Sequence, residues 1–435
     1  IGYQAGTAST TAGDAVLIGY QAGASITTGG GHLFIGKNAG DGFDTENYNM
    51  GIGSNALGGS VAGGEYNIAI GVNTLDALTS ADYNVALGYE AGTDITTGTG
   101  NTLLGSQAGK ELTTGAGNVF VGYRSGFDAA ITGDANIGLG NFALYRLTSG
   151  DNNTFLGYNS GAALTTGSNN VALGYNSMYE GTVTGQYNIA VGSSALRNLT
   201  DGPSNVAIGV NSLEALTTGD RNIAIGMSSS TGYDAENDNL AIGHSALAGS
   251  VAGGEFNVAI GNYSLDALTS ADYNVAVGYG SGGAITTGGG NIFMGYDAAA
   301  SRTEGGDSVF LGYRAGHGCT TGNDIVFIGK NAGDGHDTEG NNLGIGTNAL
   351  GGSIAGGEYN VAVGNNTLDA LTSGDYNTAM GYGAGTAVTT GAENVIIGAS
   401  AGLALTEGSN NVFVGRDSGA ANTTAGNNTF IGERA

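Results

Sequence analysis

Hydrophobic and polar positions recur along this chain about every 17–18 residues, and self-similarity at a fixed period indicates a repeat architecture. In one phase of this repeat, an aliphatic residue followed by glycine occurs 26 times, and successive occurrences lie 17 residues apart in twenty of the 25 intervals and 18 apart in the other five. The steps run from Ile1 to Ile431 without a gap. The pattern therefore predicts a single continuous repeat domain over residues 1–435, made of about 25 coils of about 17–18 residues.

The averaged coil reads I-G-Y-x-A-G/L-x-x-L-T-T-G-x-x-N-V-A. Its Asn-Val-Ala-Ile-Gly segment alternates as a β-strand requires, with Val and Ile on one side and Ala and Gly on the other. We expect a second short strand at the Leu-Thr-Thr step, for example at residues 164–166. Because a βα unit needs about 30 residues, a coil of this length predicts an all-β protein, a parallel β-solenoid or β-roll.

Two ladders are expected to hold the coils together. The aliphatic residues of the Ile-Gly steps are predicted to face inward and to stack on those of neighbouring coils. Asn lies three positions before the aliphatic residue in 21 of the 25 coils, so its amides are expected to form a second ladder. The invariant glycine suggests a close approach of backbone, or a bend. These positions are represented by Ile18, Gly19, Asn205, Ile208, Gly209, Asn257, Ile260 and Gly261.

The residue just before each aliphatic residue varies strongly in size. It is Ala at Ala207 and Ala259 but Phe at Phe120 and Phe155. A close-packed core resists such changes in volume. We therefore interpret this column as a subunit interface or a partly open surface.

Composition narrows the class of protein. The chain has 86 Gly but only one Pro and no Gly-X-Y period, which excludes collagen. Its net charge is −26 and its basic residues do not cluster, which argues against a nucleic-acid partner. Cys319 is the single cysteine, so no intrachain disulfide can form. No apolar run approaches the roughly 20 residues of a membrane span, so no membrane insertion is predicted within this segment.

The repeats resemble two families of fibrous proteins. Asn-Val-Ala-Ile-Gly at 205–209 and 257–261 is similar to the head repeat of YadA-like trimeric autotransporter adhesins, which are left-handed parallel β-rolls with shorter coils. Ile18-Gly-Tyr-Gln-Ala-Gly, with the Thr-Thr-Gly that follows, resembles repeats of phage tail-fibre-like proteins. The resemblance implies a left-handed coil, a parallel homotrimer and an extracellular location at a cell surface or on a virion. Since the chain opens and closes in the same phase of the repeat, we expect it to be a segment of a longer fibre chain.

Clusters of carboxylates recur at one position of the coil and are candidate calcium ligands. Oxygen ligands on a tight loop suit Ca²⁺, but the spacing differs from an EF-hand, and a solvated acidic corner is the favoured explanation of the clusters. No other cofactor is expected. The candidate ligands are Asp41, Asp44, Glu46, Asp334, Asp337 and Glu339, and a related group is Asp234, Glu236 and Asp238.

Three further patterns have both a structural and a functional interpretation. His317 and Cys319 are separated by a single glycine, but Cys319 occupies a position that is usually Leu or Ile, which predicts a buried thiol. Paired threonines, as at 96/97, form rows that suit either β-structure or an ice-binding face. Tyr often follows the invariant Gly, as at Tyr20 and Tyr296, in a row suited to stacking or to sugar binding.

The patterns together favour a structural and adhesive extracellular fibre, either tail-fibre-like or an adhesin shaft, that mediates attachment. Its expected partners are other copies of itself, together with a cell-surface glycan or receptor. One alternative is a filament subunit whose coils stack end to end. Another is an ice- or glycan-binding solenoid. No group of catalytic residues stands out from the repeat, so the sequence predicts no enzyme.

Overall fold

The computed structural model describes the chain except for residues 12, 61, 250–252 and 354. It contains two compact units, residues 1–220 and residues 221–435. Throughout the described residues the secondary structure is 25 three-residue strands and no helix. Each unit is a parallel β-solenoid, which confirms the fold class predicted from the period of the sequence.

One strand occurs in each coil. In the N-terminal unit the strands are β1 Val16–Ile18, β2 Leu33–Ile35, β3 Met50–Ile52, β4 Ile68–Ile70, β5 Val85–Leu87, β6 Thr102–Leu104, β7 Val119–Val121, β8 Ile137–Leu139, β9 Thr154–Leu156, β10 Val171–Leu173, β11 Ile189–Val191 and β12 Val206–Ile208. In the C-terminal unit they are β13 Ile223–Ile225, β14 Leu240–Ile242, β15 Val258–Ile260, β16 Val275–Val277, β17 Ile292–Met294, β18 Val309–Leu311, β19 Val326–Ile328, β20 Leu343–Ile345, β21 Val361–Val363, β22 Thr378–Met380, β23 Val395–Ile397, β24 Val412–Val414 and β25 Thr429–Ile431.

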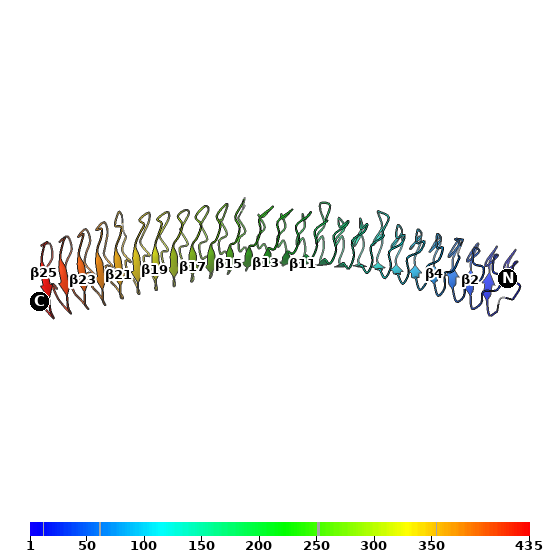
Figure 1. Ribbon diagram of the computed structural model, residues 1–435, viewed down its shortest axis with the longest axis horizontal. Coiled ribbons are helices and arrows are strands. Elements are labelled where there is room, and N and C mark those ends of the chain that lie inside the picture. The colour runs from blue at the N-terminus through cyan, green and yellow to red at the C-terminus, as the bar shows by residue number, and fades with distance from the viewer. Residues whose placement is uncertain (12, 61, 250–252, 354) are drawn as a thin grey trace. The chain divides into compact units, whose positions relative to one another are not determined.

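Within each unit, every strand pairs in parallel with the next strand along the chain (Figure 1). Equivalent residues of successive coils face each other, as Ile189 faces Val206 in the N-terminal unit and Val258 faces Val275 in the C-terminal unit. The longer coils keep this register, as in the pairing of β10 with β11, where Val171 faces Ile189. The additional residue of such a coil is therefore accommodated outside the strand.

The prediction that the aliphatic residues of the Ile-Gly steps face inward is wrong. Ile18, Ile208 and Ile260 are 39, 38 and 36% exposed, whereas the preceding residues Ala207 and Ala259 are fully buried. The reason is which of the alternating strand residues point inward. Asn205 is itself fully buried, and side chains alternate between the two faces, so the residue two positions later also points inward.

The variable Ala/Phe column is therefore core, and the prediction of an interface or an open surface there is also wrong. Phe34, Phe120 and Phe155 are fully buried. The core tolerates the changes in volume because small residues compensate for large ones between coils. Phe34 packs directly against Gly51 of the next coil, where an added Cβ would lie 3.0 Å from the Phe34 ring.

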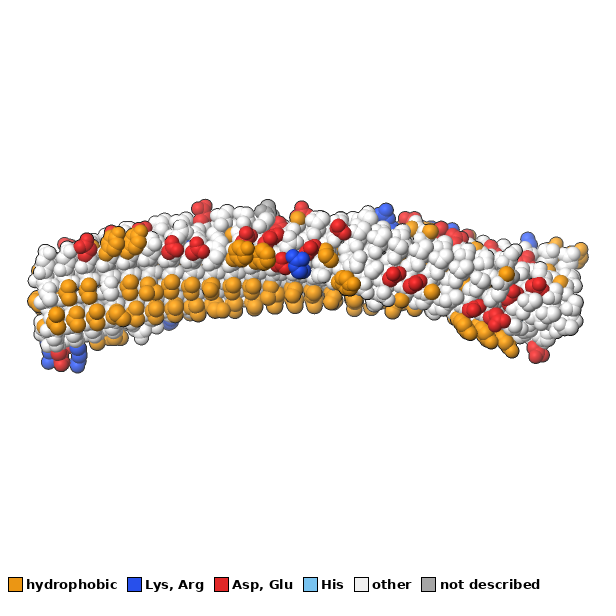
Figure 2. All heavy atoms as spheres, in the orientation of Figure 1, with side chains coloured by type: hydrophobic (Ala, Val, Ile, Leu, Met, Phe, Trp, Pro, Cys, Tyr) orange, Lys and Arg blue, Asp and Glu red, His pale blue; other side chains and the backbone are white. Residues whose placement is uncertain are grey.

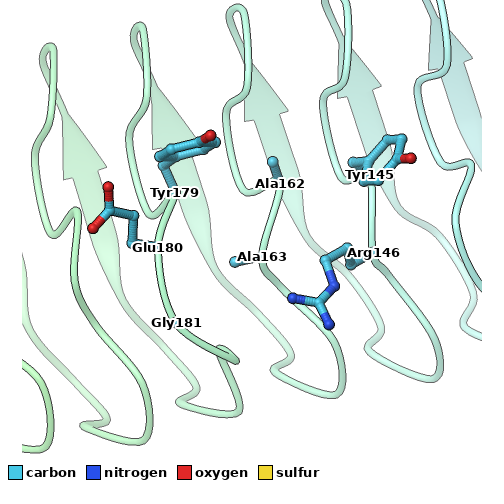
Figure 3. Close-up of a pocket in the computed structure, with 7 residues that line it drawn as sticks. All are labelled: Tyr145, Arg146, Ala162, Ala163, Tyr179, Glu180 and Gly181. Carbon is cyan, nitrogen blue, oxygen red and sulfur yellow. The ribbon is translucent and has the colours of Figure 1, made fainter.

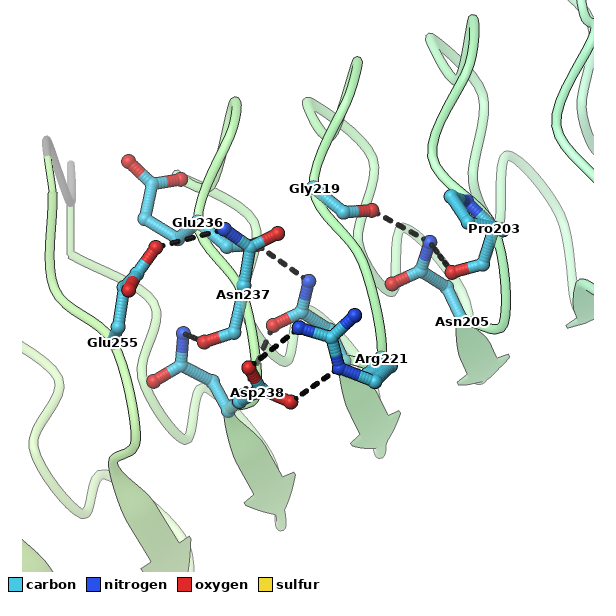
Figure 4. Close-up of polar contacts among 10 residues, drawn as sticks. Pro203, Asn205, Gly219, Arg221, Glu236, Asn237, Asp238 and Glu255 are labelled. Carbon is cyan, nitrogen blue, oxygen red and sulfur yellow. Dashed lines mark hydrogen bonds and ion pairs between the residues drawn. The ribbon is translucent and has the colours of Figure 1, made fainter.

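The expected amide ladder is present inside the coils. Asn205 Nδ2 donates to Asn188 Oδ1 at 3.2 Å. It also donates to the carbonyl oxygen of Gly219 at 2.8 Å (Figure 4). The backbone N–H of Asn205 also donates to Asn188 Oδ1, at 2.9 Å. In the C-terminal unit Asn257 repeats these bonds with Asn239. The ladder thus gives hydrogen-bond partners to buried polar groups, whose burial without a partner would destabilise the fold.

The invariant glycine is required by a close contact between successive coils. Gly19 has φ +141°, and a Cβ there would overlap the carbonyl oxygen of Gly36 in the next coil. Gly261 has φ +138° and meets Gly278 in the same way. Both conformation and space therefore exclude a side chain at these positions.

The second strand predicted at the Leu-Thr-Thr step does not form as a strand. Residues 164–166 contribute one isolated bridge, between Leu164 and Val183, and a similar bridge joins Leu112 to Ile131. In most coils the chain instead bends here, and a backbone hydrogen bond such as Thr96 N–H to the Thr113 carbonyl connects successive coils. Each coil therefore has one short strand, and the rest of the coil consists of turns and bends.

Candidate functional site: the outward sheet face and an aromatic notch

The outward face of the strands is a long apolar surface. Of the 50 outward positions, the first and third residues of each strand, 46 are aliphatic or Met and four are Thr. No outward position carries a charge, although the chain has 37 acidic residues. Figure 2 shows parallel rows of hydrophobic side chains along the C-terminal unit. Contiguous apolar surface on this scale is rare on soluble monomers and is typical of an interaction surface.

Columns of exposed aromatic rings flank this face. On the side that follows the strand, Tyr279 stacks on Tyr296 with the ring centroids 5.4 Å apart, and Tyr296 stacks on Tyr313 at the same separation. On the side that precedes the strand, Tyr66 stacks on Tyr48 at 5.3 Å and on Tyr83 at 5.2 Å. The predicted tyrosine row thus forms, and a second aromatic column accompanies it.

A more local feature interrupts the repeat in the N-terminal unit. Two residues beside the buried turn are Tyr145-Arg146 in one coil, Ala162-Ala163 in the next and Tyr179-Glu180 in the one after. The small pair between two large pairs leaves a hollow of about 520 Å³, lined by Tyr145, Arg146, Ala162, Ala163, Tyr179, Glu180 and Gly181 (Figure 3). We call this hollow the aromatic notch. Ala162 and Ala163 are only 7 and 5% exposed and form its floor.

The notch belongs to a larger aromatic cluster. A second hollow of about 280 Å³ shares Tyr145, Ala162 and Tyr179 with the notch and extends to Phe142 and Tyr158. Tyr145 is fixed by Phe127, whose ring lies 5.5 Å away, and by Phe142 at 5.7 Å. Burial, together with the charge of Asp128, raises the pKa of the Tyr145 phenol, so the hydroxyl is protonated at neutral pH.

Charged side chains stand at the edges of the notch. Glu180 pairs with Arg197, whose other nitrogen lies 3.4 Å from a carboxylate oxygen of Glu214. Arg146 is exposed and forms no ion pair with any residue that the structure describes. The notch therefore offers two tyrosine rings, a guanidinium unpaired among the described residues, and a carboxylate that is paired with Arg197 on its far side.

The candidate calcium ligands are placed differently from one another. Glu46 is buried, and its carboxylate accepts the backbone N–H groups of Asp44 at 2.7 Å and Gly63 at 2.9 Å. Asp44 is exposed and accepts the hydroxyl of Thr27. Asp41 is half-buried, and desolvation raises the pKa of its carboxyl. Glu46 therefore ties one coil to the next through backbone amides.

The second and third clusters repeat this arrangement. Glu339 accepts the N–H groups of Asp337 at 3.1 Å and Gly356 at 2.8 Å, and Glu236 makes the equivalent bonds to Asp234 and Gly253. Within the described part of the chain, no group of three or more His, Cys, Asp or Glu side chains is arranged to hold a metal ion.

His317 and Cys319 point to different sides of the coil. Cys319 is fully buried, as predicted, and burial raises its pKa to about 12. His317 Nδ1 lies 3.3 Å from Arg314 and 3.7 Å from Asp334 on the outer side. The pair therefore cannot act as a nucleophile and its base.

The two threonines of a pair have different roles. The first Thr of a pair donates its hydroxyl to the next coil, as Thr286 does to the Thr303 carbonyl at 2.8 Å, while the second, such as Thr287, is exposed. Half of the hydroxyls are thus used in holding the coils together.

Comparison with other proteins adds no identification. No protein-family model matches the chain, and no curated protein matches it. None of the described segments forms a helix of the length and hydrophobicity needed to cross a membrane.

Sequence reasoning missed the aromatic notch. A signal for it exists, because Tyr145, Ala162 and Tyr179 occupy one position in three successive coils. This row becomes visible only when the coils are aligned residue by residue. The notch becomes visible only when the alanine is recognised as a gap between two aromatic rings.

Proposed function

We propose that this protein is the shaft of an extracellular structural and adhesive fibre, in which identical chains associate side by side through their apolar sheet faces. The observation that carries the proposal is the outward face, where 46 of 50 positions are aliphatic or Met. The location at a cell surface or on a virion, and a parallel homotrimer as the assembly, follow from the resemblance of the repeats.

The size of the face supports association between copies. With coils about 4.8 Å apart and alternate residues about 7 Å apart along a strand, the face of one unit is roughly 50 Å long and, with its aromatic columns, on the order of 20 Å wide. That is on the order of 1,000 Å² per unit, comparable with the roughly 800 Å² per partner of a stable interface.

Identical copies are the partner that fits this face best. Nearly every coil presents a pair of aliphatic or Met side chains at the same two outward positions, so parallel copies in register meet equivalent positions along each unit. The face also has no charges, so burying it leaves no unpaired ion. The acidic residues lie outside it and keep the assembled fibre soluble.

The test is the oligomeric state of the purified chain. We expect an oligomer at micromolar concentration by light scattering and sedimentation. The variant Leu87→Lys/Ile208→Lys/Ile328→Lys, altered at outward positions of both units, should be monomeric because association would bury three charges. The control Thr287→Lys/Thr321→Lys/Thr390→Lys carries the same added charge on exposed positions away from the strands and should remain oligomeric.

A monomeric native chain would contradict side-by-side association. So would a sheet-face variant that keeps the oligomeric state of the native chain. Polymers that lengthen with concentration and are insensitive to the sheet-face substitutions would instead support the filament that grows end to end.

A further inference from the structure

At the aromatic notch, the side chains of three successive coils differ sharply in size. Two consecutive positions change from large to small and back to large over three coils, at Tyr145-Arg146, Ala162-Ala163 and Tyr179-Glu180. A continuous stack of rings, as in the tyrosine columns, would leave no hollow. Replacing the middle ring by alanine opens a gap with an aromatic wall at each end (Figure 3).

The dimensions of the gap suit a saturated ring. The two walls are two coils apart, roughly 9 to 10 Å at the spacing of parallel strands. One ring stacked against an aromatic face lies about 4 to 5 Å from it, so a pyranose can contact both walls at once. The hollow of about 520 Å³ has room for one or two sugar residues, and the adjoining 280 Å³ hollow continues it over Phe142 and Tyr158.

The polar groups at the edges match sugar hydroxyls. A guanidinium donates several hydrogen bonds in one plane, and a carboxylate accepts them, so Arg146 and Glu180 can pair with neighbouring hydroxyls at opposite ends of a sugar. Glu180 is already held in place by Arg197. The neutral phenol of Tyr145 adds a group that both donates and accepts.

Charge decides between ligand classes. The chain carries a net charge of −26, which repels nucleotides, sulfated glycans and other polyanions. The guanidinium of Arg146 at the rim opposes a quaternary ammonium group, which aromatic cages otherwise attract. A neutral pyranose has apolar C–H faces for the rings and hydroxyls for the charged groups, and it carries no charge itself.

We propose that the aromatic notch binds a neutral pyranose of a glycan, stacked between Tyr145 and Tyr179 and hydrogen-bonded by Arg146 and Glu180. This inference extends the adhesive part of the proposed function and places attachment on the side of the shaft. It does not depend on self-association, because every lining residue belongs to one chain.

The experiment uses the full chain with neutral methyl pyranosides and di- and trisaccharides of glucose, galactose and mannose as probes, and sialyllactose as the anionic comparison. Saturation-transfer NMR and calorimetry should detect weak binding of at least one neutral probe. Tyr179→Ala should weaken that binding about tenfold, the order expected for loss of a stacking wall. Tyr296→Ala, in a stacked column of the C-terminal unit, is the matched control and should bind as the native chain does.

A second variant separates binding from folding. Ala162→Tyr fills the gap with a ring that continues the row of Tyr145 and Tyr179, so the coils should remain as stable as in the native chain while binding is lost. Binding that persists in Ala162→Tyr would overturn the proposal, as would binding of sialyllactose alone or of no probe. Loss of sugar binding in a chain that still forms oligomers would refute the notch and leave the shaft function standing.

Discussion

The His32 imidazole takes the place of an asparagine in the amide ladder: its Nε2 lies 2.9 Å from the carbonyl oxygen of Glu46 in the next coil. In the regular coils an Asn Nδ2 donates to the same carbonyl position, as Asn205 does to Gly219. The other ring nitrogen, Nδ1, accepts the backbone N–H of Asn49 at 3.3 Å, as an Asn Oδ1 would. These two bonds fix the neutral tautomer with the proton on Nε2.

His32→Asn should therefore be tolerated, since the amide supplies the same donor and acceptor. His32→Leu should destabilise the N-terminal unit by about 1–3 kcal/mol, because the Glu46 carbonyl and the Asn49 N–H would be left without a partner inside the coil. Chemical denaturation of both variants measures the difference. Equal stability of the two would show that the hydrogen bonds of His32 contribute nothing.

A second buried histidine predicts a dependence of stability on pH. Burial lowers the pKa of His336 to about 3, from about 6.5 in the unfolded chain. The unfolded state therefore takes up a proton first, so the contribution of this group to stability is intact above pH 6.5 and is lost progressively as the pH falls towards 3. At pH 4 the loss is on the order of 3 kcal/mol.

Stability curves of the native chain and of His336→Phe should isolate this effect. Phe43 occupies the same coil position in an earlier copy of the sequence, so phenylalanine is compatible with the fold. The two curves should run parallel above pH 7 and separate below pH 6, with the native chain losing stability faster. His244→Gln, at a half-buried position beside Tyr263, is the control and should follow the native curve. Coincident curves for the native chain and His336→Phe down to pH 4 would contradict the prediction.

The contact between successive glycines predicts a large difference between two similar substitutions. Gly261→Ala should destabilise the C-terminal unit by about 2–4 kcal/mol, because its φ of +138° and the carbonyl of Gly278 both exclude a Cβ. Gly283→Ala lies in the same unit, and an added Cβ there would meet the Asp266 side chain at 3.2 Å, which can move aside, and backbone atoms only from 3.3 Å. We expect a change below about 1 kcal/mol in this control. Hydrogen exchange of the β15 and β16 amides will show whether the effect of Gly261→Ala is local, and equal effects of the two substitutions would argue against the contact.

The buried amide ladder predicts an unusual order of substitutions at Asn205. Asn205→Ala removes the donor to Gly219 and should cost about 2–3 kcal/mol. Asn205→Asp keeps the shape but brings a carboxylate against the oxygens of Asn188 and Gly219, so it should cost more than alanine at pH 7 and recover in part as the carboxylate is protonated. Thermal unfolding at pH 7 and pH 4 measures this order, and an aspartate variant as stable as the native chain would show that the ladder is accessible to water.

The sequence predicts the period and the amide ladder of this fold better than it predicts which side chains point inward. Both Val206 and Ile208 are apolar, and the Ala207 between them is small, so hydrophobicity alone favours the wrong face. The deciding information is that Asn205 is buried and hydrogen-bonded, which sets the phase of the strand. The size of Phe34 misleads in the same way, because its complement, Gly51, lies one coil away.

The candidate sites depend on relationships between coils rather than on motifs. The carboxylates at 41, 44 and 46 look alike in sequence, yet only the side chain of Glu46 is buried against backbone amides. The aromatic notch depends on the absence of a ring at Ala162, and an absence is visible only against its neighbours in the column. Aligning the coils could have indicated the notch from the sequence, whereas the hydrogen-bond partners of each carboxylate are known only from the folded structure.

Arg302 is fully buried at a position that is usually Leu or Ile. Its coil has Ser308 where most coils have the ladder Asn, and the Arg302 Nη2 donates to the carbonyl of Gly322 at 2.5 Å and to Ser308 Oγ at 3.2 Å. The guanidinium thus supplies the bond that the missing amide would make. Its Nε and Nη1 find no hydrogen-bond partner among the described residues, and burial lowers its pKa to about 10.

Restoring the regular coil should therefore stabilise the protein only when both positions change. Arg302→Leu alone leaves the Gly322 carbonyl unpaired and removes the Arg302 contact with Phe310, which offsets the gain from removing a buried charge. Ser308→Asn alone places an amide where the guanidinium already lies. The double variant should exceed the native chain in stability by about 1–3 kcal/mol, with a favourable coupling between the two substitutions of at least about 1 kcal/mol. Denaturant unfolding of all four proteins measures this coupling, and additive effects would show that Arg302 does not stand in for the ladder amide.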